Sequence, residues 1–409
     1  MHKPTWLGRK SAKLALAAAV AGGLGLTMAS PAMADYGPAP LDVVGAGSDT
    51  VQNIMNFAAD GKGNLTGFNS AGNKYKLVSL DATGDANDRS VYASGGTSPL
   101  KLSVIYRAGK SPQQRANGSG SGIAAMLQDT TIGAGETINF VRMSRLPNST
   151  EIGQADTING WGGLHVIKIA TDDLVMAAAS ASTNAVPLTA DQLVHVYQCD
   201  AGFTDWHDLN PAAPAGSTII PEAPQSGSGT GGTFIADMTA AKGSAFSYGS
   251  CVKITEENDP AAITSPPGGG SAANAIQPLS SGRKALFDSG YFHDPSVAFP
   301  TGTALTSGIQ LFYGSGGAAQ TPNACVKPTA PGQTLDYCNT RGLYLVWRHN
   351  DDTFGTPWQP GSTRNWVQTL FWRGDGTNPY IKTGGGQAAI AAGGVTATYV
   401  DCGIDPTSC

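Results

Sequence analysis

The sequence has few charged residues. Asp, Glu, Lys and Arg together make up 13% of its 409 residues, with 30 acidic and 25 basic side chains. An acidic chain with so little charge argues against a nucleic-acid partner, because such partners are bound by clusters of basic residues. It is still compatible with an anion site, which needs only backbone N–H groups and one or two arginines.

Short motifs of nucleotide, hydrolase and redox chemistry are also missing. There is no P-loop and no Cys-x-x-Cys pair, and the serines of the glycine-rich loops lack the Gly-x-Ser-x-Gly setting of a hydrolase nucleophile. Gly227-x-Gly229-x-x-Gly232 formally matches a dinucleotide fingerprint. It follows a proline-rich segment, and no convincing ribose carboxylate lies about 20 residues further on, so we predict no cofactor.

Histidine is scarce. Apart from His2, the histidines are His165, His195, His207, His293 and His349, and none lies in a His-Glu-x-x-His motif or a close pair. We interpret each as a surface or packing residue. The acidic segments Asp81–Asp88 and Asn350–Asp352 offer oxygen ligands for calcium, but their spacing differs from an EF-hand loop and solvated turns explain them. No metal site is therefore predicted.

The first 34 residues have the three parts of a secretory signal peptide. Four Lys and Arg residues lie within residues 3–13, residues 14–28 are apolar, and Ala32–Ala34 is a small-residue cleavage site. We expect a mature chain from about Asp35 that retains 21 of the 25 basic residues against 30 acidic ones, a net charge of −9. No strongly apolar run of membrane-spanning length follows, and the first cysteine is Cys199. We therefore expect a secreted or extracytoplasmic protein without a lipid anchor.

The length and the cysteine content of the mature chain predict its number of lobes and its disulfides. Its roughly 375 residues exceed the usual limit of about 250–300 for one core, so two lobes are expected. An even number of cysteines in an exported chain favours disulfides. Many pairings are open, and we favour pairing between neighbours, which closes short loops: Cys199–Cys251, Cys325–Cys338 and Cys402–Cys409.

Strands and helices are expected to alternate along the chain. Apolar and alternating runs predict strands at 41–44, 75–80, 102–106, 137–141, 163–170, 174–178, 218–220, 342–347 and 395–400. Helices are predicted at 50–59, 123–127, 187–197, 234–241 and 366–372, the third with Thr189 as its N-cap. This alternation is typical of an α/β fold with largely parallel sheets. Trp206 and Trp347 are interpreted as core residues.

Three stretches rich in glycine and hydroxyl residues each precede a predicted helix. They are residues 45–50, 118–122 and 224–234. Backbone N–H groups and hydroxyls at the positive end of a helix dipole form a site for an oxyanion, so three such loops suggest a ligand held between them. The alternative is three flexible loops in a chain that has 54 glycines.

In this order, the stretches resemble the substrate-binding proteins of phosphate ABC importers, which belong to the type II periplasmic-binding-protein superfamily. Val44–Ser48 and Gly118–Ile123 are similar to the first two ligand loops of that family. Phe140–Ser144 is similar to a strand end that carries a Ser-Asp pair, and Ser226–Thr230 to the Ser-Gly-Thr phosphate loop. The similarity covers about Val43 to Phe234 and is weak after Gly270.

The resemblance implies two α/β lobes joined by hinge strands, with phosphate bound in a cleft between them. Lobe I would comprise residues 35–160, lobe II residues 161–335, and residues 336–409 would return to lobe I. It also implies a monomer that performs no catalysis and delivers its ligand to an ABC permease in the membrane. The implied ligand contacts are Ser48, Asp49, Thr50, Ser119, Gly120, Ser144, Arg145, Ser228, Gly229 and Thr230.

The chain departs from the family pattern at three charged positions. Arg145 stands where the family usually has Asp, Pro224 where it has Arg, and Asp49 where a neutral hydroxyl is common. We hypothesise that Arg145 supplies the positive charge and that Asp49 accepts the proton of HPO₄²⁻, which would disfavour sulfate. The alternatives are that Asp49 caps a helix and that Arg145 forms an ion pair between lobes.

The sequence therefore predicts an exported phosphate-binding protein of α/β fold. A receptor for another oxyanion, or for a phosphorylated or polyol ligand, is the nearest alternative. A secreted hydrolase or an envelope adhesion protein is the alternative from a different class.

Overall fold

The computed structural model describes residues 37–82, 103–129, 136–289, 308–353 and 363–409. The predicted signal peptide, His293 and the Asp85–Asp88 part of the first acidic segment lie outside these ranges. The described residues belong to one compact unit by their contacts. The division of this unit into lobes at residues 160 and 335 stays a prediction.

Among the described residues, ten strands form one sheet, in the order β10-β9-β11-β8-β13-β7-β1-β4, with β12 and β14 each paired to β8. The strands are β1 Val43–Gly47, β4 Leu77–Ser79, β7 Phe140–Met143, β8 Leu164–Ala179, β9 Ile220–Pro224, β10 Lys253–Thr255, β11 Ala275–Ser280, β12 Ile309–Phe312, β13 Cys338–Arg348 and β14 Thr396–Ile404. Two small ribbons pair β2 (Gly61–Lys62) with β3 (Leu65–Thr66) and β5 (Ser103–Val104) with β6 (Gln113–Gln114).

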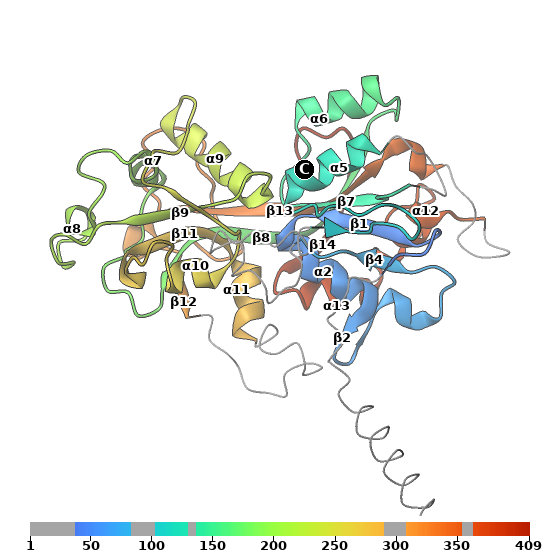
Figure 1. The fold of residues 1–409 in the computed structure, drawn as a ribbon, viewed down its shortest axis with the longest axis horizontal. Coiled ribbons are helices and arrows are strands. Elements are labelled where there is room, and N and C mark those ends of the chain that lie inside the picture. The colour runs from blue at the N-terminus through green and yellow to red at the C-terminus, as the bar shows by residue number, and fades with distance from the viewer. Residues whose placement is uncertain (1–36, 83–102, 130–135, 290–307, 354–362) are drawn as a thin grey trace, which may run out of the picture. The chain divides into compact units, whose positions relative to one another are not determined.

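Strand directions differ between the middle and the two ends of the sheet. β1 is parallel to β4 and β7, and β9 is parallel to β10 and β11. The long strands β8 and β13 are antiparallel to each other and connect the two parallel groups, as Figure 1 shows. The α/β class is confirmed, and the expected strands at 163–170 and 174–178 are one continuous strand, β8.

Helices cover the sheet on both sides of β8 and β13 (Figure 1). Thr189 caps α7 as predicted, accepting a hydrogen bond from Gln192 N at 3.3 Å. The α-helices are α2 Asp49–Asp60, α5 Ser119–Gln128, α6 Ser149–Gly153, α7 Ala190–Gln198, α8 Trp206–Leu209, α9 Gly229–Lys242, α10 Pro260–Thr264, α11 Ser281–Asp288, α12 Trp366–Leu370 and α13 Gly384–Ala391.

The hydrophobic core is divided into clusters. One cluster joins α2 to the C-terminal helices α12 and α13, with Ile54, Leu370 and Ile390 fully buried. Another lies around α7, α8 and α9, where Trp206 and Phe234 are fully buried. The first cluster joins the end of the chain to its beginning, because the apolar face of α2 is buried partly against the C-terminal helices.

The three expected disulfides are present: Cys199–Cys251, Cys325–Cys338 and Cys402–Cys409. Trp206 and Trp347 are both core residues, as predicted.

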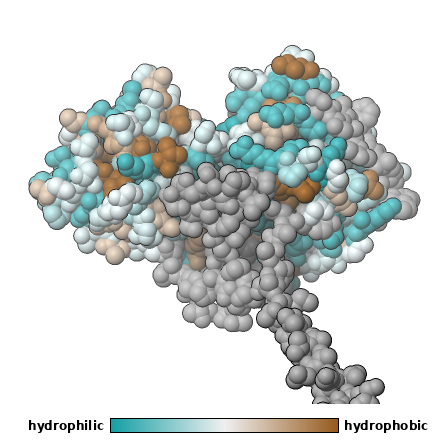
Figure 2. All heavy atoms as spheres, viewed as in Figure 1, coloured by the Kyte–Doolittle hydropathy of each residue, from teal (hydrophilic) through white to brown (hydrophobic). Residues whose placement is uncertain are grey.

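The described surface is mainly polar. Large apolar side chains that remain exposed, such as Ile158 and Ile254, belong to different elements, and the face in Figure 2 shows apolar residues as separate spots. Within the described ranges, no helix combines the length and apolar character needed to cross a bilayer.

Asp237 on α9 generates a testable prediction about stability. It is buried beside Tyr337 Oη and Asn339 Nδ2, which both donate to its Oδ2, at 2.9 and 2.7 Å. Burial raises the pKa of Asp237 to about 6, against the opposing effect of these hydrogen bonds. The folded state therefore holds this proton more tightly than the unfolded state, and the stability it contributes is lost as pH rises through about 6.

We expect Asp237→Asn to remove this pH dependence. The free energy of unfolding of the variant, relative to the wild type, should increase by up to about 3 kcal/mol from about pH 3 to about pH 7.5. Urea denaturation of both proteins at several pH values measures the difference. A difference that stays constant over this range would contradict the prediction.

Candidate functional site

The three glycine- and hydroxyl-rich loops each lead into a helix. Ser48 occupies the N-cap position of α2, Gly118 that of α5, and Ser228 that of α9, where its Oγ accepts from Gly231 N at 2.9 Å. Gly118 has φ +102° and Gly227 has φ +85°, which favour glycine, so these residues allow the tight entries. The first turns of α2, α5 and α9 therefore present backbone N–H groups, as the sequence predicted.

The loops contact one another directly. Gly120 N donates to Gly227 O at 2.9 Å, which joins the start of α5 to the loop before α9. Thr50 Oγ1 and Thr230 Oγ1 lie 3.2 Å apart, which joins the starts of α2 and α9. Helix starts about 70 to 180 residues apart in sequence thus converge on one place.

Ser119 and Ser144 lie at the same place. Their Oγ atoms are 3.3 Å apart, and Ser144 N also donates to Ser119 Oγ at 3.0 Å. A Cβ on Gly229 would lie 2.0 Å from Ser119 Oγ and 2.3 Å from Ser144 Oγ, so only glycine lets α9 approach so closely. Nine of the ten residues expected to contact the ligand therefore lie at or beside this junction: Ser48, Asp49, Thr50, Ser119, Gly120, Ser144, Ser228, Gly229 and Thr230.

The tenth expected ligand residue is Arg145, and it forms an ion pair with Glu151. Its Nη1 and Nη2 donate to the two carboxylate oxygens of Glu151, at 2.9 and 2.7 Å. Glu151 belongs to α6, directly after the Arg145 turn, so the pair is local rather than between the predicted lobes. Both terminal nitrogens of Arg145 therefore already donate to protein acceptors.

Two buried arginines that were not singled out from the sequence lie at the junction. Arg283 on α11 has its Nη2 3.4 Å from Asp49 Oδ1. Arg341 on β13 has its Nη2 3.4 Å from Thr50 Oγ1 and 3.2 Å from Asp172 Oδ2. Both side chains are almost fully buried, so these charges lie in a region of low dielectric constant, where they interact strongly.

A buried amide and two buried carboxylates complete the cluster. Asn258 Nδ2 donates to Asp49 Oδ2 at 3.1 Å and to Thr50 Oγ1 at 3.2 Å. Asp172 Oδ1 accepts from Ser280 Oγ and from Gly282 N, at 2.9 and 3.0 Å.

Glu257 is the second of these carboxylates, and its Oε2 accepts from Ser228 Oγ at 2.5 Å. Burial and the neighbouring charge of Asp49 raise the pKa of Glu257, although Ser228 and Thr230 oppose this by hydrogen bonding. The repulsion between the charges of Glu257 and Asp49 favours a state in which one of the two carboxylates holds a proton.

One sequence signal could have identified Arg283. Leu279-Ser-Ser-Gly-Arg283 is a fourth stretch in which hydroxyl residues and glycine precede a helix, and Ser280 Oγ accepts from Arg283 N at 3.2 Å as the N-cap of α11. Arg341 gave no clear signal, since it lies in the polar first part of β13, beside Asn339 and Thr340.

Some hydrogen-bond donors in this cluster have no acceptor among the described residues. Within the part of the chain that the structure describes, Arg341 Nε and Nη1 and Ser48 Oγ are buried and have no hydrogen-bond partner. A buried guanidinium N–H without a partner costs considerable free energy. An anion that accepts hydrogen bonds at this place would remove that cost.

Asp49 lies in the first turn of α2 rather than at its N-cap, which is Ser48. Its two carboxylate oxygens face Asn258 and Arg283, from distant segments of the chain. The helix-capping alternative therefore does not describe its contacts.

Comparison with known proteins gave one family and several structures. A family model described as a PBP superfamily domain matches residues 34–345. No curated protein matches the chain. A solved ABC-type phosphate transport receptor from Vibrio cholerae is 12% identical, with a TM-score of 0.44, over 87% of this chain and 100% of its own.

Two further structures are similar to a comparable degree. A putative phosphate ABC transporter substrate-binding protein with bound phosphate from Clostridium perfringens is 12% identical, with a TM-score of 0.46, over 87% of this chain and 99% of its own. An ancestral soluble variant of the human phosphate binding protein is 13% identical, with a TM-score of 0.48, over 87% of this chain and 90% of its own.

The contact between the second and third loops can be tested by substitution. A Cβ on Gly118 would lie 2.3 Å from Gly227 O, a backbone atom that cannot rotate away, whereas one on Gly109 would meet nothing within 4 Å. Both glycines have positive φ, +102° and +82°, so both variants carry a backbone penalty. Gly118→Ala should destabilise the protein by about 1–3 kcal/mol more than Gly109→Ala does, measured by chemical denaturation. Equal losses would show that the two loops do not touch in solution.

Proposed function

We propose that this chain, which belongs to the PBP superfamily, binds inorganic phosphate where α2, α5 and α9 begin. The observation that carries the proposal is the buried guanidinium of Arg341. It lies within 3.4 Å of Thr50 at one of these helix starts, and its Nε and Nη1 lack a partner among the described residues. An oxyanion is the ligand class that saturates such donors.

The helix starts add favourable electrostatics to this charge. Each contributes backbone N–H groups and the positive end of a helix dipole, and the three meet within hydrogen-bonding distance of one another. Hydroxyls of Ser48, Thr50, Ser119, Ser144 and Thr230 line the junction and can donate to the oxygens of a tetrahedral anion. The order of these loops along the chain is the one that resembles phosphate importers.

We assign the positive charge of the site to Arg283 and Arg341 in place of Arg145. Arg145 is held by Glu151, and its Nη2 would lie 3.4 Å from a Cβ on Gly120. Pro224, which stands at the family's usual arginine position, lies in β9 and contributes no charge.

Asp49 would give the site its selectivity. A buried carboxylate can accept the proton of HPO₄²⁻, whereas sulfate has no proton and would place two acceptors face to face. Arg283 and Asn258 hold the carboxylate in place, so it cannot turn away from a mismatched ligand without losing those contacts.

Binding requires the loops to separate. Asp49, Thr50, Ser119 and Thr230 have at most 2% of their surface exposed, so an anion can reach them only in a more open conformation. Two lobes, with residues 35–160 and 336–409 in one and 161–335 in the other, would open and close about β8 and β13. The closed form would present the ligand to an ABC permease in the membrane, and the exported protein would act as a monomer after signal cleavage, without a lipid anchor.

The proposal includes no reaction. The PBP superfamily is a family of binding proteins. Ser228 Oγ, the hydroxyl most like a nucleophile, donates to Glu257 and accepts from Gly231 N, which makes it a helix cap. Turnover of a chromogenic phosphate ester that is lost in Ser228→Ala would instead indicate a hydrolase.

Titration calorimetry with phosphate tests the assignment of charge. We expect saturable binding to the wild type, a loss of at least about 100-fold in Arg341→Gln, and a change of less than about threefold in Arg145→Gln, the matched control. Circular dichroism confirms that both variants are folded. A loss of phosphate affinity in Arg145→Gln but not in Arg341→Gln would support the hypothesis from the sequence that Arg145 supplies the positive charge. An absence of phosphate binding by the wild type would refute the proposal.

Comparison of phosphate with sulfate tests the role of Asp49. In Asp49→Asn, which is nearly isosteric, sulfate affinity should rise and phosphate affinity should fall, so that discrimination decreases by at least about tenfold. An unchanged ratio of phosphate to sulfate affinity would show that Asp49 does not accept the proton of the ligand.

A further inference from the structure

Two histidines and two aspartates from distant segments meet outside the anion cluster. His165 is near the start of β8, and Asp401 is in β14, which pairs with β8. His349 and Asp352 belong to a short 3-10 helix, His349–Asp352, directly after β13. Because β8 pairs with both β13 and β14, the sheet brings these four residues together.

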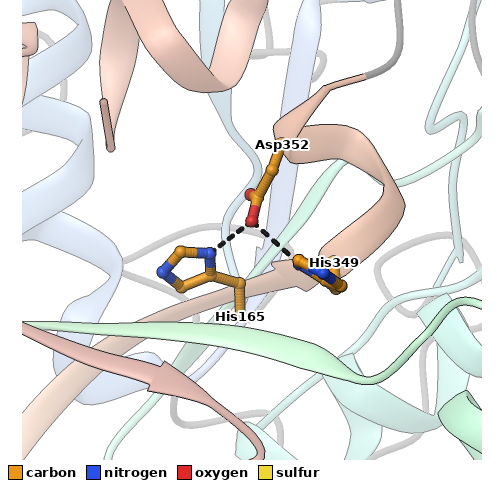
Figure 3. A group of neighbouring side chains, drawn as sticks. All are labelled: His165, His349 and Asp352. Carbon is orange, nitrogen blue, oxygen red and sulfur yellow. Dashed lines mark hydrogen bonds and ion pairs between the residues drawn. The ribbon is translucent and has the colours of Figure 1, made fainter. Parts of the chain in front are cut away.

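Two imidazole nitrogens converge on one carboxylate oxygen. His165 Nδ1 lies 2.6 Å and His349 Nδ1 lies 2.9 Å from the same atom, Asp352 Oδ2, as Figure 3 shows. All three atoms lie within 4.8 Å of one another. Asp352 Oδ1 accepts from Trp347 Nε1 at 2.6 Å, which orients the carboxylate so that Oδ2 faces the histidines.

The other ring nitrogen of His165, Nε2, pairs with a carboxylate, as is usual for histidines that bind a metal. His165 Nε2 lies 3.0 Å from Asp401 Oδ1, and Asp401 Oδ2 accepts from Trp372 Nε1 at 2.6 Å. A histidine that binds a metal through one nitrogen usually donates its other N–H to a carboxylate, which fixes the ring and raises its basicity. With Nε2–H donated to Asp401, the Nδ1 lone pair faces Asp352 Oδ2, so a positive charge is needed between them.

We propose that His165, His349 and Asp352 bind a divalent transition-metal ion, for which zinc is the best match, and that Asp401 positions His165. Two imidazole nitrogens and one carboxylate oxygen are ligands that zinc prefers, whereas calcium and magnesium prefer oxygen alone. Among the described residues, one other group of potential metal ligands occurs, Asp173 with Cys325 and Cys338, and it is excluded because its two sulfurs form a disulfide.

An ion at this place requires both imidazole nitrogens to move away from Asp352 Oδ2. Ligand atoms around tetrahedral zinc lie about 3.4 Å apart for bonds of about 2.1 Å, so the two contacts to Asp352 Oδ2 lengthen by about 0.5–0.8 Å. His165 and Asp352 are buried, but the side chain of His349 is 36% exposed, which allows entry and leaves room for water as a fourth ligand.

A proton is the competing occupant of this place. Burial lowers the pKa of His165, but hydrogen bonds and charges from Asp352 and Asp401 outweigh this, so the pKa lies above its usual value. Protons on the two imidazoles would satisfy the same atoms, and metal binding must displace them. A site that holds only protons would show no stoichiometric metal binding, whereas a metal site would.

Titration calorimetry of the purified exported protein with zinc chloride, after treatment with a chelator, tests the proposal. We expect one zinc ion per chain in the wild type and at least a tenfold weaker affinity in His349→Ala, whose partly exposed side chain can be removed without opening the core. His195→Ala is the matched control, since His195 also pairs with an aspartate, Asp200, at 2.7 Å and is 47% exposed. It should bind zinc as the wild type does.

A second variant and a second metal make the test more specific. Asp401→Ala leaves all three ligands in place, so zinc should still bind, about 10–100-fold more weakly, as expected for a positioning residue. Cobalt should give the intense visible absorption of a tetrahedral site in the wild type but not in His349→Ala, and magnesium should not bind. An absence of stoichiometric zinc binding by the wild type, or an unchanged affinity in His349→Ala, would overturn the proposal.

Discussion

The compensation of buried charge around Asp49 is the interaction on which the proposed anion site depends. Its carboxylate is fully buried and lies against Asn258 and Arg283, while Arg341 lies between Thr50 and Asp172. Charges removed from water need partners at close range, and one partner without the other would be strongly unfavourable. The segments that carry these residues must therefore be held in fixed relative positions, and the pairing of strands in the sheet does this for Arg341 and Asp172.

The paired strands β8 and β13 provide that register. Near one end of the pair, Arg341 lies opposite Asp172 in the anion cluster, and at the other end Trp347 lies opposite His165 in the proposed metal site. A metal at the second place would join β8 to the segment after β13, where no disulfide of the described chain acts. Two sites of different chemistry would thus share one pair of strands.

Local features could be predicted from the sequence with little error. The Thr189 cap, the loops before α2, α5 and α9, and the Cys325–Cys338 and Cys402–Cys409 disulfides all depend on residues close together in the chain. The order of the loops also led to the superfamily that the family model identifies over residues 34–345. The polar residues Asp172 and Asp173 interrupt the apolar pattern between 163–170 and 174–178, although both are buried within the single strand β8.

The sequence by itself determined which helix starts carry glycine and hydroxyl residues, the features on which the proposed oxyanion site rests, because these residues and the helix dipole act within one turn. It did not determine which arginine faces them. Arg145 is adjacent to a loop residue in sequence but pairs with Glu151, whereas Arg283 and Arg341 reach Asp49 and Thr50 across more than 230 residues. Only the tertiary structure decides such pairings, since the energy of a charge depends on burial and distance in space.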